Sequence, residues 1–360
     1  MSTLHLGLEE IAVAESKISS VKNTSYNKNG LKVDLVYFLN LLDHYLTANP
    51  YENLEYFIQQ ASLAAYSFPD YIKELLMNFK TYGNEDGYLL FRSFPYDRSL
   101  MNTPVNIEEV REKKKTFYSE FWLAAIARFL GEPFSYIQEN KGNIFHNVRP
   151  TYNNKDMLSS ESSTILLDFH TETAFHPYTP DFLSLFCLRS DRHKEAQTII
   201  SSIRYFQDDI DAELERILRK PLFKTGIDYS FGSVNGMRGN GPTIPILYGD
   251  SRDLLITFDP DLMRGLTDEA EMAIKTLKKI IDKHKRAVVL EEGDLIIIDN
   301  RRALHGRTYF KANFDGQDRW LQRLYISRDL TRANILFSKS ERIITYKFDR
   351  EISCVSNSSI

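Results

Sequence analysis

Two segments that lie far apart in the chain each carry a histidine at the end of an apolar, strand-like run. The first is LDFHTE at residues 167–172, which places His170 two residues before Glu172, and the second is residues 293–307, which contain His305. In an extended backbone, residues two apart point to the same side. Two imidazoles and one carboxylate are the ligand set of mononuclear non-haem Fe(II) sites, which leave one face of the metal open. These three residues therefore form a candidate metal site.

The His-x-Glu spacing alone has low specificity. It occurs twice, as His170-Thr-Glu172 and as His193-Lys-Glu195, while chance predicts roughly one His-x-Asp/Glu in a chain of this composition. His193 lies in a charged run that is typical of a solvated turn. The apolar run before His170 predicts a buried strand, in which a lone histidine is more often a hydrogen-bonded core residue. The metal site is favoured over this reading only by residues that follow His305 in the sequence.

Two such partners lie in a further strand-like stretch. Arg319 and Arg323 alternate with apolar residues in DRWLQR at 318–323, so that residues 319, 321 and 323 would share one face. If this strand paired with the strand that carries His305, both guanidinium groups would enter the same cavity. Arginine binds carboxylates through paired, charge-assisted hydrogen bonds. The alternative is a surface strand with two solvated arginines.

With these residues in place, the chain resembles the clavaminate synthase-like branch of the Fe(II)/2-oxoglutarate-dependent oxygenases, which includes hydroxylases of free amino acids. The resemblance covers roughly residues 85–330. A glutamate in the His-x-Glu position is typical of this branch. The matching segments are FHNVRP at 145–150, DFHTETAFHP at 168–177, DNRRALHGR at 299–307 and DGQDRWLQR at 315–323.

The resemblance implies that Fe(II) is bound by His170, Glu172 and His305. It further implies that 2-oxoglutarate and O2 are co-substrates, and that an unactivated C–H bond is hydroxylated with release of succinate and CO2. A non-catalytic metal-binding or sensor protein on the same fold is the alternative.

The resemblance also implies how the co-substrate and substrate are held. Arg319 would bind the distal carboxylate of 2-oxoglutarate, and Arg323 matches the arginine that binds a substrate α-carboxylate. Thr198 lies where the family often places a hydroxyl near the co-substrate, although an ordinary strand threonine is an equal reading. His176 belongs to the family signature, and we assign it no ligand role.

Four acidic or amide residues are candidates for contacts with an amino-acid substrate. Gln138 or Glu139, just before the HNV strand, could hold an α-ammonium group in a partly dry pocket. Asp259 and Asp261 align by spacing with the pair that holds a basic side chain in arginine hydroxylases, and their alternative is an Asp-Pro turn with helix capping. Two carboxylates neutralise an ammonium or a guanidinium alike.

We therefore expect a basic L-amino acid as the substrate. The overall sequence is most similar to the bacterial L-lysine hydroxylases of this branch, particularly those that oxidise C4, so L-lysine at C4 is the expected reaction. L-Arginine ranks second and asparagine lower, because two acids suit a neutral amide poorly. A carrier-bound amino acid stays open.

Composition narrows the class of protein. The 360 residues are 42% apolar, enough for a substantial core, and the net charge of −4 without a basic stripe argues against nucleic acid as a partner. No apolar run reaches membrane-spanning length, and the first 30 residues lack the features of a secretory signal. Cys187 is expected to be a buried free thiol. We expect a cytoplasmic enzyme with a small-molecule amino-acid substrate, and a homo-oligomer stays open.

The expected fold is mainly β with flanking helices, built on a double-stranded β-helix, the jelly-roll or cupin-like core. Residues 1–84 would form an N-terminal helical layer packed on the core, residues 85–330 the catalytic core and residues 331–360 a C-terminal tail, within one catalytic domain. Glycine density predicts a lid at about 220–245, or else a plain surface loop; its glycines are Gly226, Gly232, Gly236, Gly239 and Gly241. Helices are expected over 53–67, 69–79, 115–130 and 267–286, and strands over 87–93, 145–149, 165–170, 182–188, 243–248, 254–258, 294–299 and 320–327.

Overall fold

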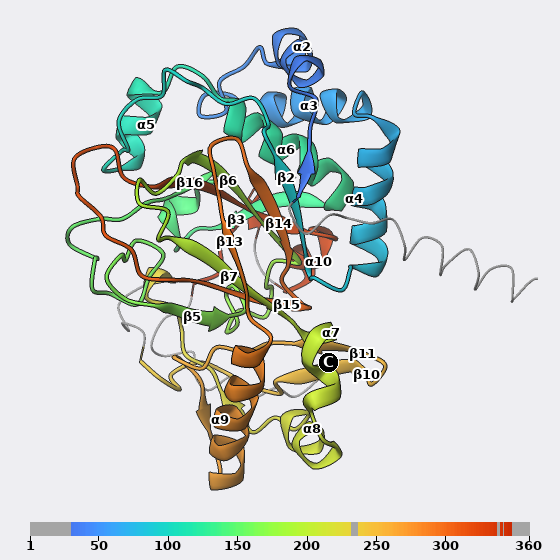
Figure 1. Cartoon of the computed structure of the whole chain (residues 1–360). Helices are drawn as coiled ribbons and strands as arrows, with labels where there is room; N and C mark the ends of the chain where they lie inside the picture. The colour runs from blue at the N-terminus through green and yellow to red at the C-terminus, as the bar shows by residue number, and fades with distance from the viewer. Residues whose placement is uncertain (1–29, 232–236, 337–338, 341, 348–360) are drawn as a thin grey trace, which may run out of the picture.

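Two β-sheets form the centre of the molecule, which is a computed structural model that describes residues 30–231, 237–336, 339–340 and 342–347 (Figure 1). The large sheet has the strand order β1-β2-β14-β6-β16-β3-β18-β17, with β4 also paired to β16, and the small sheet has the order β13-β7-β15-β5. This arrangement confirms the expected jelly-roll core. The large-sheet strands are β1 Leu31–Lys32, β2 Tyr88–Arg92, β3 Glu132–Tyr136, β4 His146–Val148, β6 Phe182–Arg189, β14 Leu295–Asp299, β16 Trp320–Ser327, β17 Lys339–Ser340 and β18 Ile343–Ile344. The small-sheet strands are β5 Leu167–His170, β7 Gln197–Ser202, β13 Arg286–Val289 and β15 Ala303–Arg307.

Strand β14 contributes side chains to both faces of the large sheet. Its residues Leu295 and Ile297 pack against the N-terminal helices, whereas Ile296 and Ile298 face the space between the sheets. All four are fully buried, because the large sheet is covered on both faces. A strand buried on both faces has a continuous apolar sequence instead of an alternating one, as the run LIII shows.

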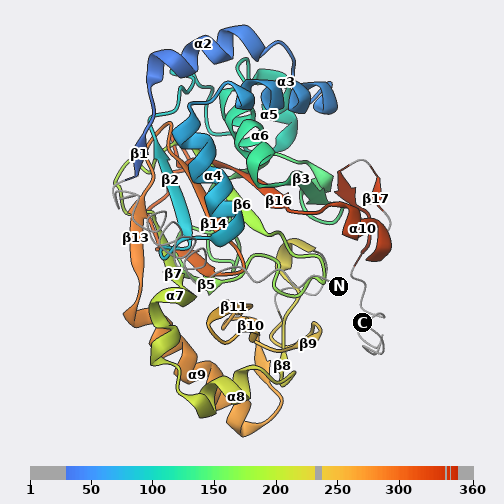
Figure 2. The ribbon, with the colours of Figure 1, turned by 90° about the vertical axis from the view of Figure 1, so that its right-hand side faces the viewer.

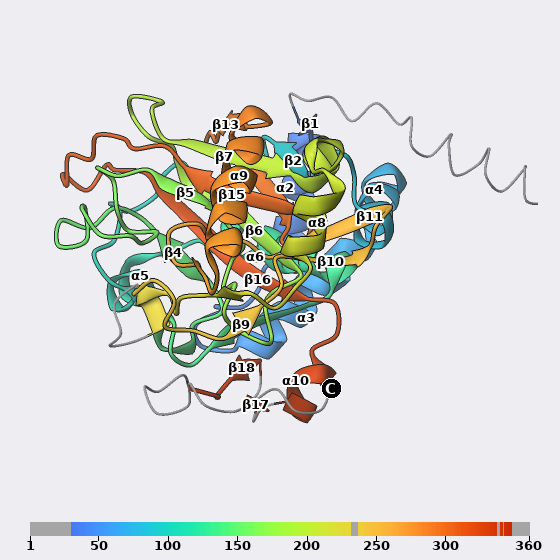
Figure 3. The same cartoon turned by 90° about the horizontal axis from the view of Figure 1, so that it is seen from below.

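Helices cover the outer faces of both sheets (Figure 2). Helices α2 Leu35–Tyr45, α3 Leu54–Tyr66, α4 Asp70–Tyr82, α5 Ile107–Lys113 and α6 Tyr118–Leu130 gather at the large-sheet end. Seen from below, α9 Asp268–Lys283 and α8 Ala212–Leu218 lie across the small sheet (Figure 3). Their apolar side chains, among them Leu214 and Leu277, share a core with Phe169, Ile199 and Leu304 of that sheet. The short helices α7 Ile203–Phe206 and α10 Thr331–Leu336 and the 3-10 turns Asn140–Gly142, Gln207–Asp209 and Tyr229–Phe231 lie in connections.

Most expected elements are present, and the differences have local causes. Helices α3 and α9 are both capped at their N-termini, since Asn53 accepts from the backbone of Tyr56 at 3.2 Å and Thr267 from that of Ala270 at 3.1 Å. Helix α9 ends at Lys283 because residues 286–289 pair with β7 as strand β13. The strand expected over 243–248 is divided at Pro245, which has no N–H for a ladder bond, into β9 Thr243–Ile244 and β10 Leu247–Asp250. Strands β10 and β11 Asp253–Ile256 form one hairpin, and β12 Arg264–Gly265, β8 Phe223–Lys224 and β9 form a small separate sheet.

The buried carboxylate of Glu120 links the N-terminal layer to β16. Lys114 Nζ pairs with Glu120, and both side chains are almost fully buried. The second oxygen of Glu120 accepts from Tyr51 OH and from Gln322 Nε2 of β16, each at 2.9 Å. These contacts support our proposal that the layer and the core form one folding unit.

Glu120→Ala tests this proposal. The change leaves the Lys114 ammonium buried without its partner, which typically costs about 3–5 kcal/mol. We expect the free energy of unfolding to fall by that amount in urea titrations, with helix content and tryptophan fluorescence changing together. Separate transitions, or a loss below about 1 kcal/mol, would contradict the proposal.

Candidate active site

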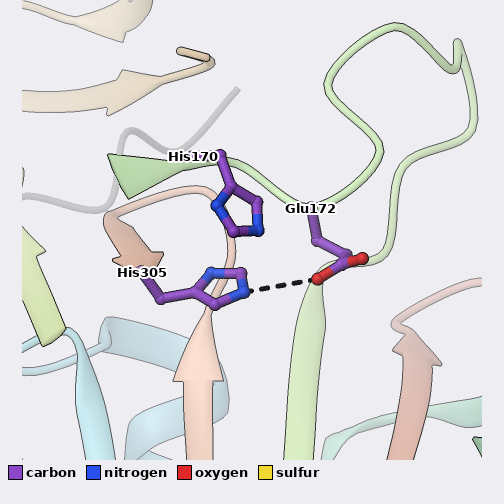
Figure 4. Close-up of side chains that lie close together, drawn as sticks. All are labelled: His170, Glu172 and His305. Carbon is purple, nitrogen blue, oxygen red and sulfur yellow. Dashed lines mark ion pairs between the residues drawn. The ribbon is translucent and has the colours of Figure 1, made fainter. Parts of the chain in front are cut away.

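Three predicted ligands converge between the two sheets (Figure 4). His170 ends β5 and His305 lies opposite it on β15 in antiparallel register, with the ring centres 4.4 Å apart. Nε2 of His305 is 3.3 Å from Oε2 of Glu172. One donor atom from each of the three residues lies within 4.8 Å of the others, so the group is compact enough to hold one metal ion.

The route by which Glu172 reaches this site differs from the expectation. Strand β5 stops at His170, and Glu172 lies in the turn that follows, in which Thr173 has a φ of +50°. Simple alternation along one strand therefore does not align His170 with Glu172. The pairing of β5 with β15 and the fixed turn after β5 bring the three side chains together.

The protonation states of the three residues suit metal binding. His170 Nδ1 is 2.8 Å from the carbonyl oxygen of Asp168, which can only accept, so Nδ1 is the donor there and Nε2 is the nitrogen that could bind a metal. Burial lowers the pKa of His305 to about 4. Although burial opposes ionisation, the Arg323 guanidinium holds the pKa of Glu172 well below its usual value. Neutral imidazoles and an ionised carboxylate are the forms that bind a metal.

Hydrogen bonds leave one oxygen of Glu172 available for a metal ion. Oε1 accepts from Arg323 Nη1 at 3.0 Å and from Tyr325 OH at 2.7 Å. Oε2 is the oxygen that faces His305. The donor set and its orientation therefore fit a two-histidine, one-carboxylate site with a single carboxylate contact.

A cavity of about 280 Å³ adjoins these ligands and is lined by both sheets. Arg319, Leu321 and Arg323 line it from one face of the β16 stretch, as predicted. The predicted pairing of that strand with β15 is wrong: β16 pairs with β6, β3 and β4 of the large sheet, whereas β15 pairs with β5 and β7. The two guanidinium groups reach the cavity from the large sheet, whereas His305 reaches it from the small sheet. The cavity therefore lies between two stacked sheets and not beside two paired strands.

Arg319 is a buried cation that forms no direct ion pair with any described residue, and Asp191 is the carboxylate that acts on its charge from farther away. Its side chain is only 6% exposed, and none of the described residues forms a hydrogen bond or an ion pair with it. Burial lowers the pKa of Arg319, yet a guanidinium stays charged at neutral pH. Thr198, almost fully buried on β7, lines the same cavity. An unpaired buried cation at a cavity wall indicates a site for an anion.

The predicted substrate residues separate into two groups. Glu139, Asp259, Asp261 and Arg323 line the cavity. Gln138 is not among its lining residues, and its amide donates to the carbonyl of Phe231 at 2.7 Å. Asp259 also accepts from the backbone of Asp261 and of Leu262, each at 3.1 Å. Asp259 therefore forms a turn at the cavity wall, but it caps no helix, because the next element is the strand β12. Contact of this acid with a substrate stays a prediction.

Arg323 is already in contact with acidic groups. It pairs with Glu139 and with Glu172, and its Nη2 lies 2.7 Å from Nδ1 of His146. Although burial opposes its charge, the two carboxylates raise the pKa of Arg323. Nε of Arg323 is buried and has no partner among the described residues, while the residue as a whole lines the cavity.

Two parts of the cavity wall were missed by sequence reasoning. Asp228 lines the cavity beside Tyr229 and Ser230, within the glycine-rich segment. The position of Asp228 within the predicted lid was the feature of the sequence that could have indicated its place at the cavity. The loop before β5, with Asn154 and residues 158–161, forms another part of the wall, and its sequence has no period that could have marked it. Gly232 and Gly236 of the predicted lid lie outside the described residues.

Other predictions outside the cavity can be compared with the structure. His193 is exposed in a turn, as expected. Cys187 is a buried free thiol, as expected. His176 is buried, and Tyr178 N donates to its Nδ1 at 2.9 Å. Among the described residues, no helix combines the length and apolar character needed to cross a membrane.

The jelly-roll core and the His-Glu-His set define a mononuclear non-haem iron oxygenase. Residues 79–325 match the family described as taurine catabolism dioxygenase TauD, TfdA family, and the chain belongs to this family. It is 34% identical over 295 residues to an L-lysine 3-hydroxylase of Catenulispora acidiphila, covering 81% of each chain. It is 33% identical over 281 residues to clavaminate synthase 2 of Streptomyces clavuligerus, covering 78% of this chain and 86% of that protein.

A solved structure supports the same assignment. Asparagine oxygenase in complex with Fe(II), 3-hydroxyasparagine and succinate superimposes with a TM-score of 0.80 at 27% identity, covering 89% of this chain and all of that chain. The protein is therefore an Fe(II)- and 2-oxoglutarate-dependent dioxygenase of the amino-acid hydroxylase group. With Fe(II) bound, such enzymes couple the oxidative decarboxylation of 2-oxoglutarate by O2 to the hydroxylation of a C–H bond.

Proposed function

We propose that this enzyme hydroxylates a free basic L-amino acid, in the first place L-lysine. The observation that carries the proposal is a group of three carboxylates on the cavity wall, Asp228, Asp259 and Asp261. Burial, with a contribution from the neighbouring acids, raises the pKa of Asp259 to about 7, and burial raises the pKa of Asp228 and of Asp261. Asp228 and Asp259 are half-buried and Asp261 is exposed. Carboxylates that gather on a cavity wall without enough positive charge favour a cationic ligand.

We assign the metal ligands and the co-substrate contacts as the sequence predicted them. His170, Glu172 and His305 hold Fe(II). Arg319 binds the distal carboxylate of 2-oxoglutarate, beside the hydroxyl of Thr198. The support is the compact donor set and the unpaired, buried guanidinium on the same cavity. Fixing both ends of the co-substrate restricts its orientation before reaction.

The α-carboxylate and α-ammonium of the substrate need partners of opposite charge. We assign the carboxylate to Arg323, because it is a cation on the cavity wall. We assign the ammonium to Glu139 in preference to Gln138, because Glu139 lines the cavity and Gln138 does not. Burial raises the pKa of Glu139 to about 7, and a bound ammonium would favour its ionised form.

Two neighbouring carbons of lysine are candidates for the new hydroxyl group. The sequence-based prediction is C4, and relatives named L-lysine 4-hydroxylase are 25–27% identical to this chain. The L-lysine 3-hydroxylase is 34% identical. The proposal therefore specifies C3 or C4, and NMR of the product assigns the carbon. L-Arginine is the second candidate, because three carboxylates suit a guanidinium too and an L-ornithine/L-arginine 3-hydroxylase is 26% identical.

A panel of the free L-amino acids tests the proposal. Protein loaded anaerobically with Fe(II) and 2-oxoglutarate is exposed to O2 with each amino acid in turn, and products are followed by mass spectrometry. We expect the highest kcat/KM for lysine, with one added oxygen atom. A preference for arginine would support the second candidate. Succinate formation without any oxidised free amino acid would contradict the proposal and indicate a carrier-bound or unusual substrate.

The acids on the cavity wall predict a pH dependence. Below about pH 7 the Asp259 carboxyl carries its proton in the free enzyme and offers no charge, whereas the lysine ε-ammonium stays protonated up to a pKa of about 10.4. We expect kcat/KM for lysine to rise from pH 6 to pH 8. Asp259→Asn should lower kcat/KM at pH 8 at least about tenfold, the value of one hydrogen bond to a charged group. It should also make the rise smaller, and the rise that remains is due to Glu139, whose pKa is raised to about 7 as well.

Asp250→Asn is the matched control, because Asp250 is exposed on β10 and pairs with Arg252 at the surface. It should retain both the rate and the pH profile. An unchanged profile in Asp259→Asn would show that Asp259 does not contact the substrate cation.

A further inference from the structure

The backbone of Glu172 lies beyond the end of the strand ladder. His170 is the last residue of β5 that pairs with β15. The next peptide N–H, of Thr171, donates to the carbonyl of Phe258 at 2.8 Å. Glu172 itself has no strand beside it among the described residues. A buried backbone N–H and C=O need partners, so another group must hold this residue.

The side chain of Asn300 is that group. Its Oδ1 accepts from Glu172 N at 2.9 Å, and its Nδ2 donates to Glu172 O at 3.2 Å. The same Nδ2 also donates to Pro180 O at 3.0 Å. A carboxamide offers one acceptor and N–H donors as a peptide group does. Asn300 thus takes the place of a neighbouring strand at Glu172.

Asn300 is itself held firmly. It is 1% exposed and lies in the tight turn that joins β14 to β15. Its backbone N–H donates to Asp181 O at 3.0 Å, and the turn is closed by a bond of 3.1 Å from Arg302 N to Asp299 O. Strand β15, which carries His305, begins directly after this turn. The turn therefore fixes the start of the His305 strand and the backbone of Glu172 at once.

We propose that Asn300 is a positioning residue of the metal site, which couples the placement of Glu172 to that of His305. The inference rests on the proposed function of His170, Glu172 and His305 as ligands. Asn300 does not line the cavity, so it acts through Glu172 and not on the substrate. Arg323 and Tyr325 fix the outer oxygen of Glu172, whereas Asn300 fixes where its backbone lies.

A merely structural role would predict a loss of stability without a specific loss of metal affinity. Asn300→Asp is the more informative variant, because it keeps the size and the acceptor but removes both N–H donations. Asn300→Ala removes all three hydrogen bonds of the Asn300 side chain, two to the backbone of Glu172 and one to that of Pro180. Asn147→Ala is the matched control, since Asn147 is also a buried amide, and its Oδ1 accepts from Trp320 Nε1 at 2.9 Å. Asn147 does not line the cavity.

Binding of Co(II) to metal-free protein, followed by the visible absorption of the bound ion, gives a readout independent of turnover. We expect Asn300→Asp to weaken Co(II) binding about 10- to 100-fold, the range for groups that orient metal ligands, and to change the absorption spectrum. Asn147→Ala should lower the melting temperature with an unchanged Co(II) Kd. A wild-type Kd and spectrum in Asn300→Asp, or an equal weakening in Asn147→Ala, would overturn the inference.

His305→Ala separates failure of this inference from failure of the proposed site. If the wild type binds one Co(II) that His305→Ala does not bind, the metal site stands and the Asn300 variants decide the inference. If the wild type binds no Co(II), or His305→Ala binds it equally well, both the proposed site and the role of Asn300 are overturned.

Discussion

Replacing His305 with alanine is expected to abolish hydroxylation while the protein remains folded. His305 faces Glu172 and His170 at the candidate metal site. Loss of a group that only orients a ligand weakens metal binding about 10- to 100-fold, so loss of the ligand itself should exceed that range. Nδ1 of His305 is buried without a partner among the described residues, so alanine removes no hydrogen bond there. Fe(II) titration, product formation and the melting temperature of the metal-free protein measure these effects.

His193→Ala is the matched control for this experiment. His193 carries the other His-x-Glu spacing of the chain, but it is exposed in a turn. Its replacement should leave both Fe(II) binding and turnover unchanged. Retained turnover in His305→Ala would contradict the assignment. A large loss of melting temperature in the metal-loaded protein, without loss of turnover, would instead indicate a structural metal, whose binding energy contributes to folding.

Arg319→Met is expected to raise the KM for 2-oxoglutarate about 30-fold or more. Removing one partner of a buried charge pair costs about 2–5 kcal/mol, and 1.4 kcal/mol corresponds to a factor of ten. Without the co-substrate, Arg319 is a buried cation that no described residue pairs with. A thioether of similar length should therefore leave the ligand-free protein as stable as the wild type, or more stable.

Thermal shifts make this prediction specific. 2-Oxoglutarate should raise the melting temperature of the metal-loaded wild type, and this shift should disappear in Arg319→Met. Arg319→Lys should show an intermediate shift, because an ammonium keeps the charge but loses the two-pronged geometry. A full shift in Arg319→Met would place the co-substrate elsewhere.

The face of β16 that carries the two arginines could be predicted because it depends on local periodicity. Alternation along one strand is enough to place Arg319, Leu321 and Arg323 on one side, and the structure confirms it. Which strand lies beside which depends on tertiary packing, so the pairing of β16 with β15 was wrong. Periodicity also could not reveal that β5 ends before Glu172, since the turn is stabilised by distant partners such as Asn300.

The rest of the site comes from loops, where sequence has little periodic signal. Asp228 precedes the 3-10 turn Tyr229–Phe231, and Asn154 belongs to the long connection before β5. Loops commonly carry binding residues on a rigid scaffold. Which loop side chains line a cavity depends on the tertiary packing of the loops, and a sequence without periodicity does not indicate that packing. Glu139 and Gln138 show this, because adjacent residues differ in whether they line the cavity.

The most direct test of the proposed reaction is its coupling to L-lysine. Purified wild-type protein, loaded with Fe(II) and 2-oxoglutarate, is given O2 with and without lysine, and succinate and hydroxylysine are measured together. The account predicts that lysine accelerates succinate formation and that succinate and hydroxylysine appear in equal amounts. Unmodified lysine, with succinate forming no faster than in its absence, would contradict the account.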